Sequence, residues 1–457
     1  MNLHAPLRRM SIRLQAFALL AALASMPALA GEYVPPRHAW ARQAPAEAGF
    51  DPAKLADAVA HAQANAEVEP SDLRQVLMES FGAREPDYRI LGPVQPRAGA
   101  SGVIVRGGRI VAEWGDLERA DMTFSAVKSY LSTVAGLAVA DGRIASLDDR
   151  VSRYVPGDRF EGVHNGAITW RHLLHQTSDW SGTLWEVADW ADRPEGDDPA
   201  NRPLRTPGTH YKYNDVRINL LAWALMEVVR EPLPQMLRRR IMDPIGASST
   251  WRWHGYDNSW VELDGLRMQS VSGGGHFGGG MFISTLDHAR FGLLMERDGV
   301  WGDTRLVASD WIAQATAPSP VKPDYGYLWW LNTGREAIPA APDSAFWAAG
   351  FGGNYVYIDR EHDLVIVLRW TPAVFEPCRA IHNPRQYPCP PTSCTPSTTR
   401  SGPRFAHGMR TSRVLRTGWR ATRSNTHRSW AWPMAVPTRG TGWNRWSSRG
   451  NRCTCSV

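Results

Sequence analysis

The sequence predicts an α+β fold, in which an antiparallel sheet is flanked by helices and a helical subdomain is inserted. Strand patterns open and close the body of the chain, at residues 102–116 (GVIVRGGRIVAEWGD) and 345–370 (AFWAAGFGGNYVYIDREHDLVIVLRW). Helix and loop patterns fill roughly residues 145–285 between them. Separated strand and helix runs of this kind are typical of α+β domains rather than of alternating α/β folds.

The first elements follow from simple local signals. Residues 52–66 (PAKLADAVAHAQANA) have helical composition, and Gly107-Gly108 marks a tight hairpin turn between two alternating runs. In residues 124–142 (FSAVKSYLSTVAGLAVADG), apolar side chains recur at helical spacing, and Gly142 ends the run. We therefore expect a hairpin followed by a buried helix.

The centre and end of the body continue this pattern. The expected helices share apolar residues at three- and four-residue spacing: 170–176, 216–229, 233–242 and 286–299. A glycine-dense turn (SGGGHFGGGMF) starts at Ser272, and DREHD forms the turn of the last hairpin. The Trp-rich run STWRWHGYDNSW is interpreted as packing, with a carbohydrate platform as the alternative. The inserted helical subdomain is expected at about residues 131–284.

The N-terminus has the pattern of a cleaved export signal. A basic segment (MNLHAPLRRMSIRL) precedes a short apolar stretch that ends in Ala28-Leu29-Ala30. A membrane anchor is the alternative, but the apolar run is short and Pro27 interrupts it. We expect residues 1–30 to be removed, no membrane span in the mature chain, and a periplasmic or secreted location.

The C-terminal tail, residues 377–457, differs from the rest of the chain. It holds 14 of the 51 basic residues and no acidic ones, so the remaining residues carry 37 basic against 45 acidic groups. The net charge of +6 therefore gives no reason to expect nucleic-acid binding by the body. The tail is too poor in aliphatic residues to fold. It is interpreted as an out-of-frame translation, with a basic disordered extension as the alternative.

All five cysteines also lie in this tail, and no Cys/His metal spacing occurs, so the sequence predicts no metal site and no cofactor.

The chemistry centres on a Ser-x-x-Lys pair, Ser125 and Lys128. Residues i and i+3 share one face of a helix, and a buried lysine loses its proton more easily, so Lys128 can act as base for the Ser125 hydroxyl. Ser319 and Lys322 have the same spacing, but they lie in the turn-like stretch APSPVKPDYG. We interpret that second pair as structural.

Several ordered motifs, together with Ser-x-x-Lys, resemble the serine β-lactamase and penicillin-binding-protein superfamily. They include LDDRVSRYVPG, ITWRHLLHQTSDW, TPGTHYKYNDVRINLLAWALMEV and the final strand pair. The resemblance covers roughly residues 45–375 and is strongest to the class C-like branch, particularly 6-aminohexanoate-dimer hydrolases and carboxylesterases. It implies a β-lactamase/transpeptidase-like fold, an acylated nucleophile at Ser125 and a base at Lys128. It also implies that Tyr213, six residues after Pro207, moves the proton to the leaving group.

Two positions depart from the pattern of the branch. Asp215 stands where the Tyr-x-Asn motif has its asparagine, with Asn214 one place early. An aspartate offers no amide donor, and its charge would hold Lys128 in the protonated form. The strand motif, usually Lys-Thr-Gly or His-Thr-Gly, reads Ala-Ala-Gly and ends at Gly350. The resemblance then implies that the backbone N–H groups of Ser125 and Phe351 form the oxyanion hole.

These observations predict an exported serine hydrolase that cleaves a small-molecule ester or amide through an acyl-enzyme. The alternative is a penicillin-recognising or peptidoglycan-binding protein with slow or no turnover. His276, in the glycine-dense turn, is a further candidate for the substrate cleft. If the tail is out of frame, the helix that normally follows the last strands is missing, and a damaged, unstable product is a third possibility.

Overall fold

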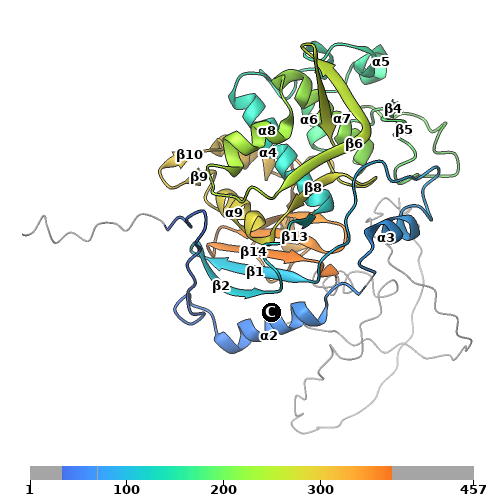
Figure 1. Cartoon of the computed structure of the whole chain (residues 1–457). Helices are drawn as coiled ribbons and strands as arrows, with labels where there is room; N and C mark the ends of the chain where they lie inside the picture. Colours follow the sequence, from blue (N-terminus) through green and yellow to red (C-terminus); the bar gives the residue numbers. More distant parts are fainter. Residues whose placement is uncertain (1–32, 69, 373–457) are drawn as a thin grey trace, which may run out of the picture. The chain divides into compact units, whose positions relative to one another are not determined.

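The computed structural model describes residues 33–68 and 70–372 (Figure 1). The predicted export signal at 1–30 and the predicted tail at 377–457 lie outside the described residues, so both stay predictions. None of the described helices is long and apolar enough to cross a bilayer.

The largest sheet has six antiparallel strands in the order β11-β12-β13-β14-β1-β2. Along the sheet these are β11 (Trp330–Leu331), β12 (Phe346–Gly350), β13 (Asn354–Asp359), β14 (Leu364–Arg369), β1 (Ser101–Arg106) and β2 (Arg109–Trp114). The β1–β2 turn has Gly107 and Gly108 at φ of 54° and 76°, and residues 360–363 turn β13 into β14. Both hairpins are confirmed, and the first and last strands of the described residues, β1 and β14, pair with each other.

Helices pack on both faces of this sheet (Figure 1). On one face, α9 (Thr285–Glu296) approaches closely through Gly292, where a β-carbon would lie 2.6 Å from a Val365 methyl group. On the other face, α2 (Pro52–Ala64) places Leu55 and Ala62 in a buried cluster with Ile104, Val111, Trp114 and Leu368. The predicted α+β fold, an antiparallel sheet flanked by helices, is confirmed.

The remaining helices lie mostly in the middle of the chain. They are α3 (Leu73–Ser80), α4 (Val127–Ala140), α5 (Gly162–Asn165), α6 (Trp170–Leu174), α7 (Asp215–Val229), α8 (Leu233–Leu237) and α10 (Ser309–Ala315). A π-helical turn, Arg238–Met242, continues α8. Helices α4 and α7 are buried along nearly their whole length and contact each other, so they form the centre of the core.

A second sheet, in the order β3-β8-β6-β7, corrects one expectation. Its strands are β3 (Asp121–Met122), β8 (Gly280–Ile283), β6 (Arg252–Leu263) and β7 (Leu266–Val271). The prediction of helix and loop is therefore wrong for residues 252–271. The signal was present: Asp264-Gly265 is a two-residue hairpin sequence, and both residues have positive φ, at 54° and 73°. Two short ribbons, β4 (Thr183–Leu184) with β5 (Val187–Ala188) and β9 (Val300–Trp301) with β10 (Thr304–Arg305), complete the strands.

Candidate active site

Ser125 lies in a tight turn that connects β3 of the second sheet to the buried helix α4. After β3, a 3₁₀ turn spans Phe124–Ala126 and leads directly into α4. Phe124 has a φ of 48°, which is rare for a bulky residue and costs about 1–3 kcal/mol. Packing maintains it, since its ring is buried and meets Phe351 at 5.2 Å and Trp370 at 6.2 Å between centroids. The turn therefore holds the Ser125 backbone rigidly.

Contacts from the last strand fix the segment before this turn. The Arg369 guanidinium donates to the carbonyl oxygens of Asp121 at 3.0 Å and Met122 at 3.2 Å. The Trp370 indole donates to the Asp121 carboxylate at 2.6 Å. Burial lowers the pKa of Arg369 to about 10, so its charge persists near neutral pH. The Ser125 turn is thus braced by residues almost 250 positions further along the chain.

Lys128 is the second residue of α4 and contacts Ser125 directly. Its Nζ donates to Ser125 Oγ at 2.9 Å, and its side chain is only 2% exposed. The same Nζ contacts Asp215 Oδ1 at 2.6 Å. Ser125 itself is partly exposed, so a reactant can approach it while its lysine partner stays away from water.

Tyr213 and Asp215 come from the start of α7. The Tyr213 ring centroid lies 4.7 Å from Lys128 Nζ and stacks on Trp330 at 6.1 Å. Asn214 is the N-cap of α7, because its side chain accepts from the Arg217 N–H at 2.9 Å. The structure therefore brings Tyr213 and Asp215 to Lys128 and uses Asn214 for the helix start, in agreement with the Pro207 register.

The Asp215 carboxylate is buried and faces two cations. Its Oδ1 meets Lys128, and its Oδ2 meets Arg193 NH1 at 2.9 Å. Burial opposes its ionisation, but the charges of Lys128 and Arg193 outweigh this and hold the pKa of the Asp215 carboxyl well below its usual range. Asp215 is therefore an anion, as the sequence suggested, and it lies between Lys128 and Arg193.

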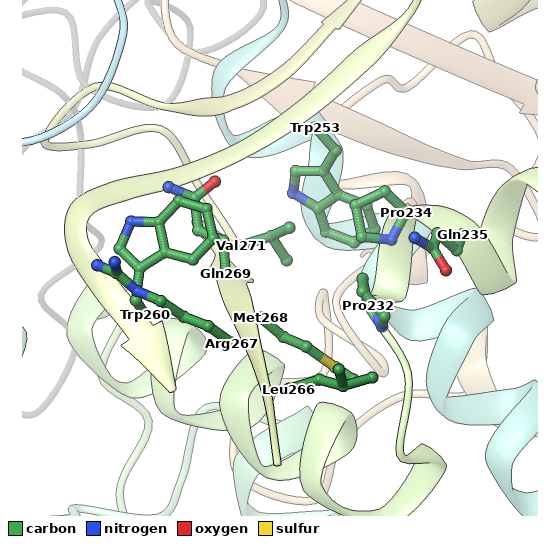
Figure 2. A pocket seen from close by; sticks show the side chains of 10 residues that line it. All are labelled: Pro232, Pro234, Gln235, Trp253, Trp260, Leu266, Arg267, Met268, Gln269 and Val271. Carbon is green, nitrogen blue, oxygen red and sulfur yellow. The ribbon is translucent and has the colours of Figure 1, made fainter. Parts of the chain in front are cut away.

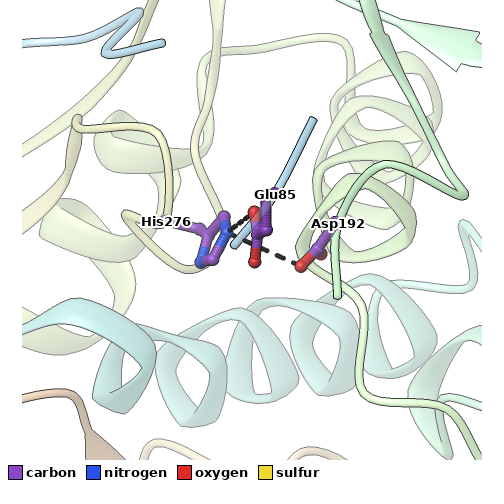
Figure 3. Close-up of side chains that lie close together, drawn as sticks. All are labelled: Glu85, Asp192 and His276. Atoms are coloured by element: carbon purple, nitrogen blue, oxygen red, sulfur yellow. Dashed lines mark hydrogen bonds and ion pairs between the residues drawn. The ribbon is translucent and has the colours of Figure 1, made fainter. Parts of the chain in front are cut away.

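His276 belongs to a buried network of charged side chains beside Asp215 (Figure 3). Its Nε2 lies 2.6 Å from Glu85 Oε2 and 3.6 Å from Asp192 Oδ1, and its Nδ1 lies 3.2 Å from Arg193 NH2. Both ring nitrogens are engaged and the side chain is 1% exposed. His276 is therefore linked to Asp215 through Arg193, and its Nδ1 also lies 3.9 Å from Asp215 Oδ2, while its place in a substrate cleft stays a prediction.

Glu85, Asp192 and His276 carry atoms of the kind that bind metal ions. One ligand atom each from Glu85, Asp192 and His276 lies within 4.8 Å of the others. Arg193, however, already contacts both Asp192 and His276 with its guanidinium. Arg193 therefore already supplies a positive charge beside the Asp192 carboxylate of this cluster.

The end of β12 lies against the Ser125 turn. A β-carbon at Gly350 would come closer than 3.0 Å to the Thr123 carbonyl oxygen and would lie 3.2 Å from the Ala126 nitrogen. Only a glycine allows this approach, and Phe351 follows it in the turn between β12 and β13. The backbone of residues 350–351 is thus beside that of residues 124–126, as an oxyanion hole shared by two segments requires.

The glycine-dense turn contacts the site at Gly274. A β-carbon there would come closer than 3.0 Å to both Asp215 Oδ1 and Lys128 Nζ. Gly274 therefore leaves the space in which the Lys128–Asp215 ion pair forms.

The second Ser-x-x-Lys pair has no comparable setting. Ser319 is buried and its Oγ accepts from the Val321 N–H at 3.3 Å, while Lys322 pairs with Asp324. It lies in a turn rather than at a helix start, which agrees with its interpretation as structural.

A separate pocket lies between α8 and the β6–β7 hairpin (Figure 2). It encloses about 480 Å³ and is lined by Pro232, Pro234, Gln235, Trp253, Trp260, Leu266, Arg267, Met268, Gln269 and Val271. Trp260 and Leu266 are exposed, at 42% and 61%. None of the candidate catalytic residues lines it.

With this geometry in place, comparison with known proteins identifies the class. A family model described as Beta-lactamase matches residues 89–386, and the chain belongs to that family. It is thus a member of the β-lactamase-fold hydrolases, a group that includes esterases and amidases.

The chain is also similar to individual proteins. The 6-aminohexanoate-dimer hydrolase of Paenarthrobacter ureafaciens is 25% identical over 300 residues, which are 58% of this chain and 70% of that protein. A family VIII carboxylesterase structure is 19% identical, with a TM-score of 0.45 over 65% of this chain and 90% of that one. A Mycobacterium bovis β-lactamase structure is 18% identical, with a TM-score of 0.44 over 67% and 98%. These identities are too low to transfer a substrate.

Sequence reasoning missed the residues that complete the network. Arg193 and Asp192 lie in the loop WADRPEGDD, and Glu85 lies between α3 and β1. Nothing in their local patterns marks them, because only the fold brings them to Asp215. Gly274 was within the glycine-dense turn that the sequence singled out, but its contact with Lys128 could not be inferred from spacing.

Proposed function

We propose that this chain is an exported serine hydrolase that cleaves an ester or amide through an acyl-enzyme on Ser125. The observation that carries the proposal is the 2.9 Å contact between Lys128 Nζ and Ser125 Oγ at the start of a buried helix. A nucleophile and a base within hydrogen-bond reach, with the base oriented by a third group, are the requirements of nucleophilic catalysis.

The proposed reaction has two steps. In the form that has released its own proton, Lys128 takes the Ser125 hydroxyl proton as Oγ bonds to the substrate carbonyl carbon, and the carbonyl electron pair becomes an oxyanion. The N–H groups of Ser125 and Phe351 bind this oxyanion. When it collapses, the bond to the alcohol or amine breaks, and the proton passes through Tyr213 to that leaving group. Water then attacks the acyl-enzyme with the same groups in reverse, releasing a carboxylic acid and Ser125.

The surroundings favour a neutral substrate. Strand β12 presents Ala348 and Ala349 before Gly350, so it offers no cation for a substrate carboxylate. Phe351 and the stacked Tyr213 and Trp330 rings are aromatic neighbours of the site. An uncharged ester or simple amide fits these residues better than a β-lactam with its carboxylate.

The Lys128–Asp215 contact supports the second candidate, a penicillin-recognising protein that acylates slowly. A buried carboxylate 2.6 Å from Nζ favours the charged ammonium, which cannot accept the Ser125 proton. Steady release of product from a simple ester would favour the hydrolase, whereas slow release of at most one product per protein molecule would favour the penicillin-recognising protein.

The test is intact-mass analysis after treatment with a fluorophosphonate probe. The hydrolase proposal expects one adduct on the wild type and on Ser319→Ala, and none on Ser125→Ala. Ser319→Ala is the matched control, since it removes the serine of the other Ser-x-x-Lys pair. No adduct on folded wild-type protein would refute the proposal. For export, the mature protein from the periplasm or medium is expected to begin at Gly31, as mass spectrometry of its N-terminus would show.

A further inference from the structure

Arg193 reaches the catalytic centre from a loop far from Ser125 in sequence. It follows β5, and its guanidinium contacts Asp192, Asp215 and His276. Its backbone has a φ of 53°, an unfavourable conformation for a non-glycine residue, and its N–H donates to Glu85 Oε1 at 3.3 Å. Four polar contacts therefore hold a strained arginine in one place.

The position of this guanidinium decides how Asp215 acts on Lys128. Asp215 Oδ1 is 2.6 Å from Lys128 Nζ, and Arg193 NH1 is 2.9 Å from Oδ2 of the same carboxylate. With Lys128 as its single cation, a buried carboxylate would keep the ammonium protonated. A second cation on the other oxygen reduces that attraction, and the part of its charge that the Asp192 carboxylate does not balance also repels a proton on Lys128.

The groups that face Lys128 come from five segments. They are Ser125 before α4, Tyr213 before α7, Asp215 on α7, Arg193 after β5, and, through Asp215, His276 in the glycine-dense turn. Asp215 is the anion of this set in direct contact with Nζ, and Arg193 contacts that anion from the opposite side. The arginine also lies over the Tyr213 ring, with Cζ 5.2 Å from the centroid.

We propose that Arg193 is a positioning residue that counteracts Asp215, so that Lys128 can release its proton and serve as the base for Ser125. The role in catalysis rests on the hydrolase function proposed above. The chain thereby combines an aspartate at the usual asparagine position with an arginine that offsets its charge.

The test follows Lys128 directly, because the chain has four lysines, Lys54, Lys128, Lys212 and Lys322. Protein labelled with ¹³C at the lysine ε-carbon gives a spectrum simple enough to titrate by NMR, and Lys128→Arg identifies the Lys128 signal. Arg193→Met is expected to move the Lys128 titration midpoint upward by about one to two pH units. Arg193→Met/Asp215→Asn is expected to remove that shift, and Arg193→Lys to keep the midpoint near that of the wild type.

An unchanged midpoint in folded Arg193→Met would overturn the proposal. If circular dichroism shows Arg193→Met to be unfolded, Arg193→Gln takes its place: a raised Lys128 midpoint supports the proposal, and an unchanged one overturns it. The NMR titration measures Lys128 whether or not the protein hydrolyses an ester. Failure of the hydrolase proposal would therefore be seen in the labelling and ester assays and not in the NMR midpoint. If the protein is active, the rate of fluorophosphonate labelling should rise with pH as Lys128 loses its proton. The midpoint of that rise is expected to move with the NMR midpoint of Lys128.

Discussion

The most direct test of the oxyanion-hole geometry is Gly350→Ala. An added methyl group would meet the Thr123 carbonyl oxygen at under 3.0 Å, whereas ordinary contact begins near 3.4 Å. Because Gly350 has an ordinary φ and is not among the positive-φ glycines, the strain is steric and not conformational. To relieve this contact, the end of β12 and the Ser125 turn must move apart by about 1 Å.

The expected loss follows from that displacement. A misplacement of about 1 Å can cost on the order of 100-fold in rate, and removing one oxyanion donor costs about 10²–10³ in kcat. Gly350→Ala should therefore lower the fluorophosphonate labelling rate and kcat/KM for a p-nitrophenyl ester about 100-fold. Overpacking at this site should also cost about 1–3 kcal/mol of unfolding free energy.

Gly99→Ala is the matched control. Gly99 is exposed, a β-carbon added to it would meet no atom within 4 Å, and it is not a positive-φ glycine. This variant should label at the wild-type rate. If Gly350→Ala stays within about threefold of Gly99→Ala, far from the expected loss of about 100-fold, the end of β12 does not contribute to the oxyanion site.

Three further outcomes are expected. Tyr213→Phe should lower ester kcat by about 10²–10⁴ if the phenol transfers the proton, and a folded variant with normal kcat would exclude that role. Asp215→Asn should destabilise the fold by about 3–5 kcal/mol at pH 7, because two buried cations lose their anion. Since the pKa of Asp215 is lowered in the fold, this stabilisation is complete above the ordinary carboxyl pKa of about 4 and is lost as the pH falls below it. The melting-temperature gap between the wild type and Asp215→Asn should therefore shrink from pH 7 to pH 3, and a constant gap would contradict this. Gly265→Ala should cost about 1–2 kcal/mol in urea unfolding, because Gly265 has a φ of 73° and open space around it.

The sequence predicted the local parts of this molecule well. Helical periodicity and glycine turns gave the buried helix after Ser125 and both hairpins of the large sheet. The Ser125–Lys128 contact followed from i,i+3 spacing alone, and the Pro207 register placed Tyr213 beside Lys128. The roles of these residues in catalysis stay predictions, because geometry shows proximity and not reaction.

The remaining features depend on contacts between distant segments. Arg193 and Glu85 carry no pattern of their own, and their function as partners of Asp215 and His276 appears only when the loops are folded together. The β6–β7 hairpin was missed for a different reason. The aromatic residues around Trp253 and Trp260 were interpreted as packing or as a platform, although Asp264-Gly265 marked a turn.

The bracing of the Ser125 turn by Arg369 and Trp370 also has a consequence for biosynthesis. Val103 of β1 pairs with Val367 of β14, so the middle of the sheet cannot close until the last strand has left the ribosome. Until then the nascent chain exposes β1 without its neighbour and holds Ser125 without its brace. If Ser125 is the nucleophile that we propose, a chain that stops before residue 369 should therefore show no fluorophosphonate labelling at any stage of its synthesis.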